Sequence, residues 1–255
     1  MKSHMNLKSH AHIYDTIGRR YRSRRQPDPR IARTIRTALG DDARTLCNIG
    51  AGSGSYEPED IAVTAVEPSE TMISQRRSPT RVVRARAEEL PFEDNEFDVA
   101  MAILSVHHWE DPVQGLVEMR RVSKRQVVFT FNQEMQNRLW LVEEYLPEIV
   151  DLESGRGICF SDLLSQVDAR EVIDVPIPHD CVDGFQAAYW RRPELYLDAE
   201  VQANISTFAQ LPPEVVSRGM ARLKSDIDSG VWARRHAFLL EKESFDFGYR
   251  IVISN

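Results

Sequence analysis

The sequence of 255 residues is poor in cysteine, in basic charge and in long apolar runs, and each shortage excludes a class of protein. Its three cysteines, Cys47, Cys159 and Cys181, cannot all pair and match no zinc spacing, which predicts a reducing, cytoplasmic setting and no metal site. Acidic residues outnumber basic ones by 39 to 32, so a nucleic-acid partner is disfavoured. The longest strongly apolar stretch, 99–106, is too short to span a bilayer, and we see no secretory signal, so no membrane partner is expected.

What the chain does contain is a regular alternation of short apolar runs and helical segments. Asp28, Ser69 and Asp111 are typical N-caps for helices over 29–39, 70–77 and 113–122. The predicted strands are 45–49, 61–66, 82–85, 97–104 and 126–131. Repeated strand–helix–strand units predict an α/β protein with a mostly parallel sheet and helices on both faces.

The second half of the chain has a different pattern. Residues 133–165 have helical character, 171–177 is predicted as a sixth strand, 182–241 is mostly helical and 249–253 is a final strand. The sheet is therefore expected to have seven strands and a helical lid, inserted between the last two strands.

A glycine-rich turn, Gly50-Ala51-Gly52-Ser53-Gly54, follows the first predicted strand. Glycines at alternate positions let the backbone turn tightly and approach a ligand, because no Cβ intervenes. The spacing differs from the G-x-G-x-x-G of nicotinamide-binding folds, and the nearby carboxylates Glu57, Glu59 and Asp60 would repel a diphosphate. The turn favours a ligand other than a dinucleotide, and an ordinary glycine turn is the alternative.

Glu67 ends the second predicted strand, seventeen positions after Gly50. A carboxylate at such a strand tip can accept hydrogen bonds from both hydroxyls of a ribose. Together with the glycine turn, Glu67 predicts a ribose-binding edge of the sheet.

Four blocks of sequence follow one another between about residues 45 and 132. They are Asn48-Ile49-Gly50-Ala51-Gly52-Ser53-Gly54, Val66-Glu67-Pro68-Ser69-Glu70-Thr71-Met72, Ala87-Glu88-Glu89-Leu90-Pro91-Phe92, and Phe97-Asp98 with Leu104-Ser105-Val106-His107-His108-Trp109. In order and spacing the chain resembles the class I S-adenosylmethionine-dependent methyltransferases, specifically the small-molecule branch that includes the ubiquinone-biosynthesis type. The resemblance implies a Rossmann-like seven-stranded fold, S-adenosylmethionine as cofactor, and methyl transfer to a small organic acceptor. We divide the chain accordingly into an N-terminal helical cover (1–42), a cofactor-binding half (43–132) and the rest of the same domain with the lid and last strands (133–255).

The resemblance also implies a set of cofactor-binding residues. Gly50 and Gly52 would lie against the methionine part, Glu67 would hold the ribose and Met72 would pack on the adenine. The full expected set is Arg25, Asn48, Gly50, Ala51, Gly52, Glu67, Pro68, Met72, Ala87, Glu88 and Leu104.

Two positions depart from the family pattern. Asn48 stands where the family usually has Asp, so it can accept a hydrogen bond but contributes no charge. Arg86 stands where an adenine-binding Asp is common, and arginine cannot accept a hydrogen bond. We therefore expect adenine to be recognised by backbone groups or by Glu88.

The acceptor half carries less specific signals. His108 and His179 are candidates for the general base, because the pKa of histidine lies near working pH. The alternative is that His107 and His108 are scaffold, with methyl transfer achieved mainly by positioning. Candidate acceptor-binding residues are Tyr14, Tyr21, Tyr189, Trp190 and Arg191. The alternative to a cofactor role for Arg25 is a solvated basic stretch. The alternative to an acceptor role for Tyr189, Trp190 and Arg191 is a well-packed lid.

Two other functions remain open from the sequence. An RNA or protein methyltransferase would share the cofactor half, but the acidic balance and the lack of an appended binding module count against it. A non-catalytic S-adenosylmethionine-binding regulatory protein would show cofactor affinity without turnover.

Overall fold

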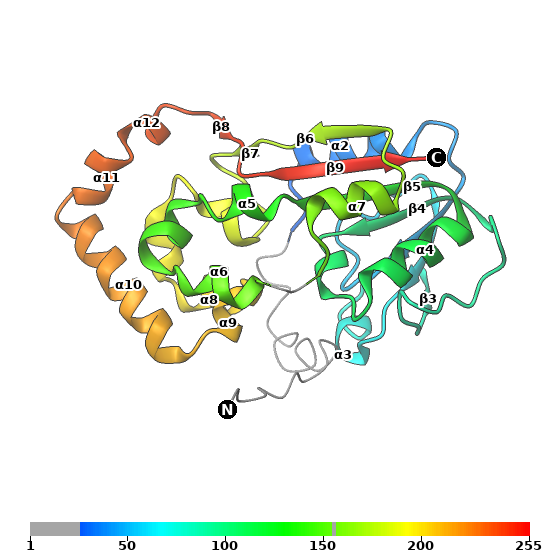
Figure 1. Cartoon of the computed structure of the whole chain (residues 1–255), viewed down its shortest axis with the longest axis horizontal. Coiled ribbons are helices and arrows are strands. Elements are labelled where there is room, and N and C mark those ends of the chain that lie inside the picture. The colour runs from blue at the N-terminus through cyan, green and yellow to red at the C-terminus, as the bar shows by residue number, and fades with distance from the viewer. Residues whose placement is uncertain (1–25, 155–156) are drawn as a thin grey trace.

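The computed structural model describes residues 26–154 and 157–255, so the predicted site residues Tyr14, Tyr21 and Arg25 lie outside the described residues. Its centre is a seven-stranded sheet with the order β3-β2-β1-β4-β5-β9-β6 (Figure 1). Strands β1 to β5 are mutually parallel, and β9 runs antiparallel to both of its neighbours. The predicted seven-stranded, mostly parallel sheet is confirmed. Its strands are β1 (Thr45–Ile49), β2 (Ala62–Val66), β3 (Arg81–Val83), β4 (Phe97–Ile103), β5 (Ser123–Phe131), β6 (Glu171–Asp174) and β9 (Tyr249–Ser254).

The predicted sixth strand over 171–177 is divided in the structure. Its first part is β6, whereas Ile177–Pro178 forms β7 and pairs with β8 (Ser244–Phe245) in a separate two-stranded ribbon. Pro176 lies between the two parts and has no N–H to donate to a ladder, which explains the break.

Helices cover both faces of the sheet. Helix α2 (Pro29–Leu39) begins at its N-cap Asp28 and packs on β5 and β9, whereas α4 (Pro112–Val122) packs on β4 and β5 and is flanked by α7 (Phe160–Gln166). Figure 1 shows α4 and α7 in front of the sheet and α2 behind it. Successive side chains of β5 point to opposite faces of the sheet. Val127 therefore packs in one apolar cluster and Val128 in the other. Helix α3 (Glu70–Ile73) is shorter than the predicted 70–77.

A helical lobe lies beside the sheet (Figure 1). The predicted helical stretch over 133–165 is broken into α5 (Gln133–Gln136), a π-helical turn (Leu141–Tyr145), α6 (Glu148–Glu153) and α7. The predicted lid is formed by 3₁₀ turns at Gln186–Tyr189 and Pro193–Leu197, then by α8 (Ala199–Asn204), α9 (Ser206–Gln210), α10 (Pro213–Asp228), α11 (Val231–Arg235) and α12 (Ala237–Leu240).

Aromatic packing joins the parts of this lobe into one core. Trp140 is buried and donates from Nε1 to the carbonyl of Trp190 at 2.8 Å, and its ring lies 5.2 Å from that of Trp232. Gly219 of α10 has to be small, because a Cβ there would lie 2.5 Å from the carbonyl oxygen of Tyr145. Within residues 26–154 and 157–255, none of the helices combines the length and apolarity that a membrane crossing requires.

Candidate active site

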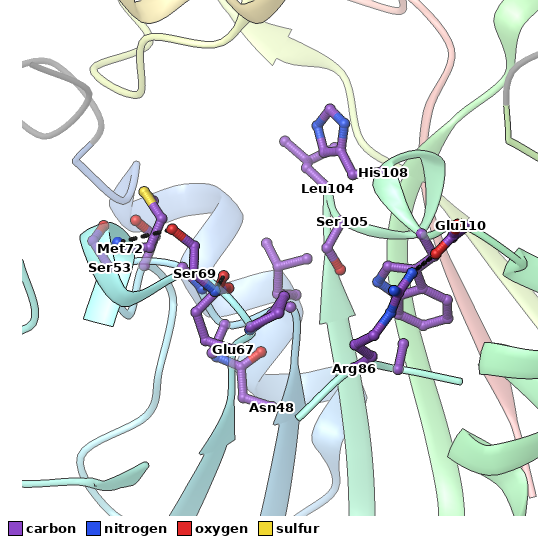
Figure 2. Close-up of a pocket in the computed structure, with 18 of the residues that line it drawn as sticks. Asn48, Ser53, Glu67, Ser69, Met72, Arg86, Leu104, Ser105, His108 and Glu110 are labelled. Carbon is purple, nitrogen blue, oxygen red and sulfur yellow. Dashed lines mark hydrogen bonds and ion pairs between the residues drawn. The ribbon is translucent and has the colours of Figure 1, made fainter. Parts of the chain in front are cut away.

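A cavity of about 170 Å³ lies at the carboxyl ends of β1, β2 and β4, where the strand order reverses (Figure 2). Ligands of open α/β sheets bind at this kind of switch point. Figure 2 shows Glu67 and Met72 on one side of the cavity and Leu104 and His108 on the other. Every predicted cofactor-binding residue except Arg25, which is not described, lines this cavity. The residues in question are Asn48, Gly50, Ala51, Gly52, Glu67, Pro68, Met72, Ala87, Glu88 and Leu104.

The glycine turn forms the floor of the cavity. Gly50 and Gly52 have φ values of 67° and 51°, which L side chains rarely adopt. A Cβ on Gly50 would also lie 2.7 Å from the Cβ of Ser105. The N–H groups of Gly50 and Ala51 donate to the carbonyl of Val66 at 2.9 and 3.0 Å, which ties the turn to the end of β2.

Glu67 is held in place by two backbone N–H groups. Its Oε2 accepts from Gly52 at 2.8 Å and its Oε1 accepts from Ser69 at 2.9 Å, and only 7% of the residue is exposed. Each oxygen of an ionised carboxylate can accept more than one hydrogen bond. The chain thus fixes the plane of this carboxylate at the cavity wall before any ligand binds.

A buried ion pair supports the other side of the turn. Arg76 lies 2.6 Å from Glu57 and also donates to the carbonyl of Gly52 at 3.1 Å. Arg76 compensates the charge of Glu57, one of the three carboxylates from which the sequence predicts repulsion of a diphosphate. Asn48 donates from Nδ2 to Glu57 at 2.8 Å, and the buried Oδ1 of Asn48 accepts no hydrogen bond from the described residues. An orphaned acceptor in the wall of this cavity fits a ligand that carries an ammonium donor.

Neither Glu57 nor Arg76 was singled out as a site residue by the sequence. Arg76 follows α3 outside any motif, and only its contact with Glu57 reveals its part in the turn.

At the opposite end of the cavity, Arg86 forms ion pairs with Glu110 and, at 3.5 Å, with Glu88. The Oε1 of Glu88 accepts from the backbone N–H groups of Glu110 and Asp111 at 2.8 and 3.1 Å, so it orders the turn before α4. Recognition of adenine by Glu88 stays a prediction, and the same carboxylate also stabilises this turn.

Leu104 and His108 form the boundary between this cavity and a second region. Leu104 follows β4 with φ +48°, a conformation that residues other than glycine rarely adopt, and donates its N–H to the carbonyl of Phe129 at 2.8 Å. Both residues also line one or both of two smaller neighbouring cavities, of about 40 and 50 Å³. Of the two predicted general bases, only His108 therefore lies beside the main cavity.

The two smaller cavities are assembled from segments far apart in the sequence. They are lined by Leu104, His107, His108, Phe131, Gln133, Gln136, Leu152, Glu153, Phe185, Gln186, Asn204, Ile205, Ser206, Thr207, Gln210 and Tyr249. Apart from Leu104 and His108, none of these was predicted as a site residue, because no local motif marks them.

The predicted base His179 lies elsewhere. It follows β7, with Nε2 3.3 Å from the carboxylate of Glu243, and lines none of the three cavities. Arg191 is nearby, 3.9 Å from the same carboxylate, and is also outside the cavities. The geometry gives no support to either residue as part of the site.

Tyr189 and Trp190 are likewise outside the three cavities. Trp190 is fully buried and donates from Nε1 to the carbonyl of Ile177 at 3.0 Å, and the ring of Tyr189 packs edge-on against Tyr196. These aromatic residues belong to the core of the lid, which is the alternative that the sequence left open.

A parallel sheet with a glycine turn after its first strand and a buried carboxylate after its second is typical of α/β proteins that bind a nucleoside-containing ligand. A family model described as a methyltransferase domain matches residues 47–131. A crystal structure described as that of a proposed methyltransferase from an antibiotic biosynthesis pathway of Anabaena variabilis is 33% identical, covers 91% of this chain and 98% of that one, and superposes with a TM-score of 0.83. The chain belongs to the class I S-adenosylmethionine-dependent methyltransferases.

Curated relatives match over shorter regions. The uncharacterized methyltransferase YcgJ of Bacillus subtilis is 29% identical over an alignment of 126 residues that covers 45% of this chain and 46% of YcgJ. The ubiquinone/menaquinone biosynthesis C-methyltransferase UbiE of Geobacter is 29% identical over 92 residues, 35% of this chain and 39% of UbiE. The chain thus matches less than half of the length of these relatives.

Proposed function

We propose that the chain binds S-adenosylmethionine in the cavity at β1, β2 and β4 and transfers its methyl group to a small organic acceptor. The observation that carries this proposal is the carboxylate of Glu67, which is fixed by the N–H groups of Gly52 and Ser69 at a cavity wall. A ribose with two adjacent hydroxyls is the ligand group that such a carboxylate binds best.

The residues around Glu67 suit the remaining parts of this ligand. The glycine turn and the orphaned Oδ1 of Asn48 would hold its amino-acid end, and Met72 and Ala87 offer buried apolar surface for its base. S-adenosylmethionine, when bound, supplies an electrophilic methyl group. Leu104 and His108, at the boundary to the smaller cavities, are the residues best placed to orient the acceptor.

His108 is our candidate for the group that receives the acceptor's proton, or that aligns the acceptor where no proton has to leave. Methyl transfer to an aligned nucleophile depends chiefly on proximity and orientation. A small acceptor is supported by the size of the neighbouring cavities and by the lid helices around them. The pathway described for the Anabaena relative also favours a small molecule over RNA or protein.

Titration calorimetry with S-adenosylhomocysteine tests the proposal, with NAD⁺ at the same concentrations as the competing ligand class. One-to-one binding of S-adenosylhomocysteine and no heat with NAD⁺ is the expected result. Binding of NAD⁺ alone, or of neither ligand, would overturn it.

A further inference from the structure

Two charged side chains lie behind the glycine turn and do not line the cavity. The side chains of Arg76 and Glu57 are only 3% and 6% exposed, and neither residue is part of the main cavity's lining. Nη2 of Arg76 donates to both carboxylate oxygens of Glu57, at 2.7 and 2.6 Å. A Cβ on Gly54 would lie 3.1 Å from Oε2 of Glu57 and 3.3 Å from Cζ of Arg76, so the turn packs directly on this ion pair.

Stability alone is a poor explanation of an ion pair buried at this position. Taking two charges out of water costs free energy that their attraction returns only when the geometry is very good, and apolar replacements are often neutral or stabilising. A second role accounts better for the pair. A guanidinium can donate in two directions at once, which no apolar side chain can do.

The second direction of the guanidinium leads to Gly52. Nη1 of Arg76 donates to the carbonyl of Gly52 at 3.1 Å, and the N–H of Gly52 donates to Oε2 of Glu67 at 2.8 Å. Gly52 has φ +51°, and a glycine left unconstrained has more backbone freedom than any other residue. Both polar backbone groups of Gly52 are thus held by charge-assisted hydrogen bonds, which are stronger than neutral ones.

We propose that Arg76 is a positioning residue for ligand binding. Its guanidinium, with its charge balanced by Glu57, orients Gly52 so that the N–H of Gly52 aligns the carboxylate of Glu67 for the ribose. Arg76 acts through the turn and does not contact the ligand itself. The inference rests on the proposed function, because it needs Glu67 to bind the ribose of S-adenosylhomocysteine.

A double variant separates positioning from folding. Glu57→Gln with Arg76→Met removes both charges together, so no uncompensated charge stays buried, and the new amide oxygen can still accept from Asn48, which donates to Glu57 at 2.8 Å. Asp246→Asn with Arg250→Met is the matched control. The side chain of Arg250 is 11% exposed and lies 2.7 Å from Asp246, and both residues are outside the three cavities.

Thermal unfolding and calorimetric titration with S-adenosylhomocysteine are measured on the parent and on both double variants. Both should remain folded, and only the first should lose affinity, by about tenfold, as expected for one hydrogen bond to a charged group. A parent that does not bind would contradict the proposed function. A parent that binds, together with parent-like affinity in the first double variant or equal losses in both, would overturn this inference alone.

A double-mutant cycle then tests the route through Glu67, because a merely structural role of Arg76 would not depend on that carboxylate. Glu57→Gln and Arg76→Met are repeated together in the Glu67→Ala protein. Once the carboxylate is gone, the N–H of Gly52 has nothing to align, so the further loss of affinity should fall from about tenfold to about twofold. An equal loss in the two backgrounds would rule out this route.

Arg76→Lys carries the test if the double variant does not fold. Lysine keeps a positive charge beside Glu57, but its one nitrogen cannot occupy the positions of both Nη1 and Nη2. Affinity for S-adenosylhomocysteine should fall by about threefold or more, whereas Arg77→Lys, a change of the exposed neighbouring arginine, should leave it unchanged. Parent-like affinity in Arg76→Lys would then count against the positioning role.

Discussion

The backbone N–H of Gly52 donates to Oε2 of Glu67 at 2.8 Å, so the glycine turn after β1 and the carboxylate after β2 are one unit. Ser69 donates to the other oxygen, and the same turn is tied to Val66 through its own N–H groups. Removing the carboxylate therefore removes a ligand acceptor and also loosens the turn that would hold the other end of the ligand.

Glu67→Ala should bind S-adenosylhomocysteine roughly 10- to 150-fold more weakly than the parent, because a hydrogen bond to a charged acceptor contributes about 1.5–3 kcal/mol. Calorimetric titration measures the loss. Glu70→Ala is the control, since Glu70 is exposed and pairs with Arg84 outside the cavity. Parent-like affinity in Glu67→Ala would mean that another group binds the ribose.

Gly52→Val should abolish measurable binding of S-adenosylhomocysteine. Gly52 has φ +51° and lines the cavity, so a branched side chain would strain the turn and occupy ligand space. Gly230→Val separates the two effects, because Gly230 has φ +69° at the start of α11 and lines none of the cavities. We expect both variants to lose thermal stability and only the first to lose affinity. Binding retained in a folded Gly52→Val protein would sink the assignment.

The two histidines proposed from the sequence should differ in effect. His108→Ala is expected to weaken S-adenosylhomocysteine binding by a few-fold, because His108 lines the main cavity. His179→Ala should leave that affinity within about two-fold, since His179 lies against Glu243 outside the cavities. Calorimetric titration of the two variants compares them directly, and a larger loss in His179→Ala would reverse our assignment.

Asp28 should give the protein a pH-dependent stability. Burial opposes its ionisation, but hydrogen bonds from Arg30 and from the N–H of Val182 outweigh that cost and lower the pKa of Asp28 to about 2, from 3.8. Because the folded-state pKa is depressed, the stabilisation is complete above about pH 5 and is lost as the pH falls through about 2.

The test is Asp28→Asn, which we expect to be less stable than the parent by roughly 1–2 kcal/mol at pH 7. The difference should shrink to about half at pH 3. Urea unfolding midpoints at the two pH values measure it, and a difference that does not change with pH would rule out the carboxylate's charge as its origin.

The three thiols should react very unequally. Burial raises the pKa of both Cys47 and Cys181 to about 12, whereas Cys159 is exposed. Since the thiolate is the reactive form, Ellman's reagent at pH 8 should titrate one thiol in the folded protein and three in urea. Cys159→Ser should show no fast phase, and a fast phase that persists would place a buried cysteine at the surface.

Much of the cofactor half could be predicted from the sequence, for a physical reason. Its functional residues lie at the ends of successive strands, and the carboxyl ends of parallel strands meet at one edge of the sheet. Local signals such as the N-cap Asp28, the alternate glycines at Gly50 and Gly52, and the strand-end Glu67 therefore indicated both the fold and the residues that line the main cavity.

Where the sequence prediction failed, long-range packing decided the result. Arg76 reaches Glu57 from nineteen positions away, and Pro176 divides a predicted strand whose second part pairs with β8, about seventy residues later in the chain. Neither contact is encoded in a local pattern.

The two smaller cavities beside His108 are the clearest case. Phe131 ends β5, Glu153 ends α6 and Asn204 ends α8, and only the packing of the helical lobe against the sheet brings them together. Tyr189 and Trp190, which the sequence predicts to bind the acceptor, are buried in the core of the lid. The sequence by itself determined the parallel sheet and its cofactor edge through local turn chemistry, whereas the wall that an acceptor would meet was decided by tertiary structure, because burial of the lobe's apolar surface sets which polar side chains face the cavity.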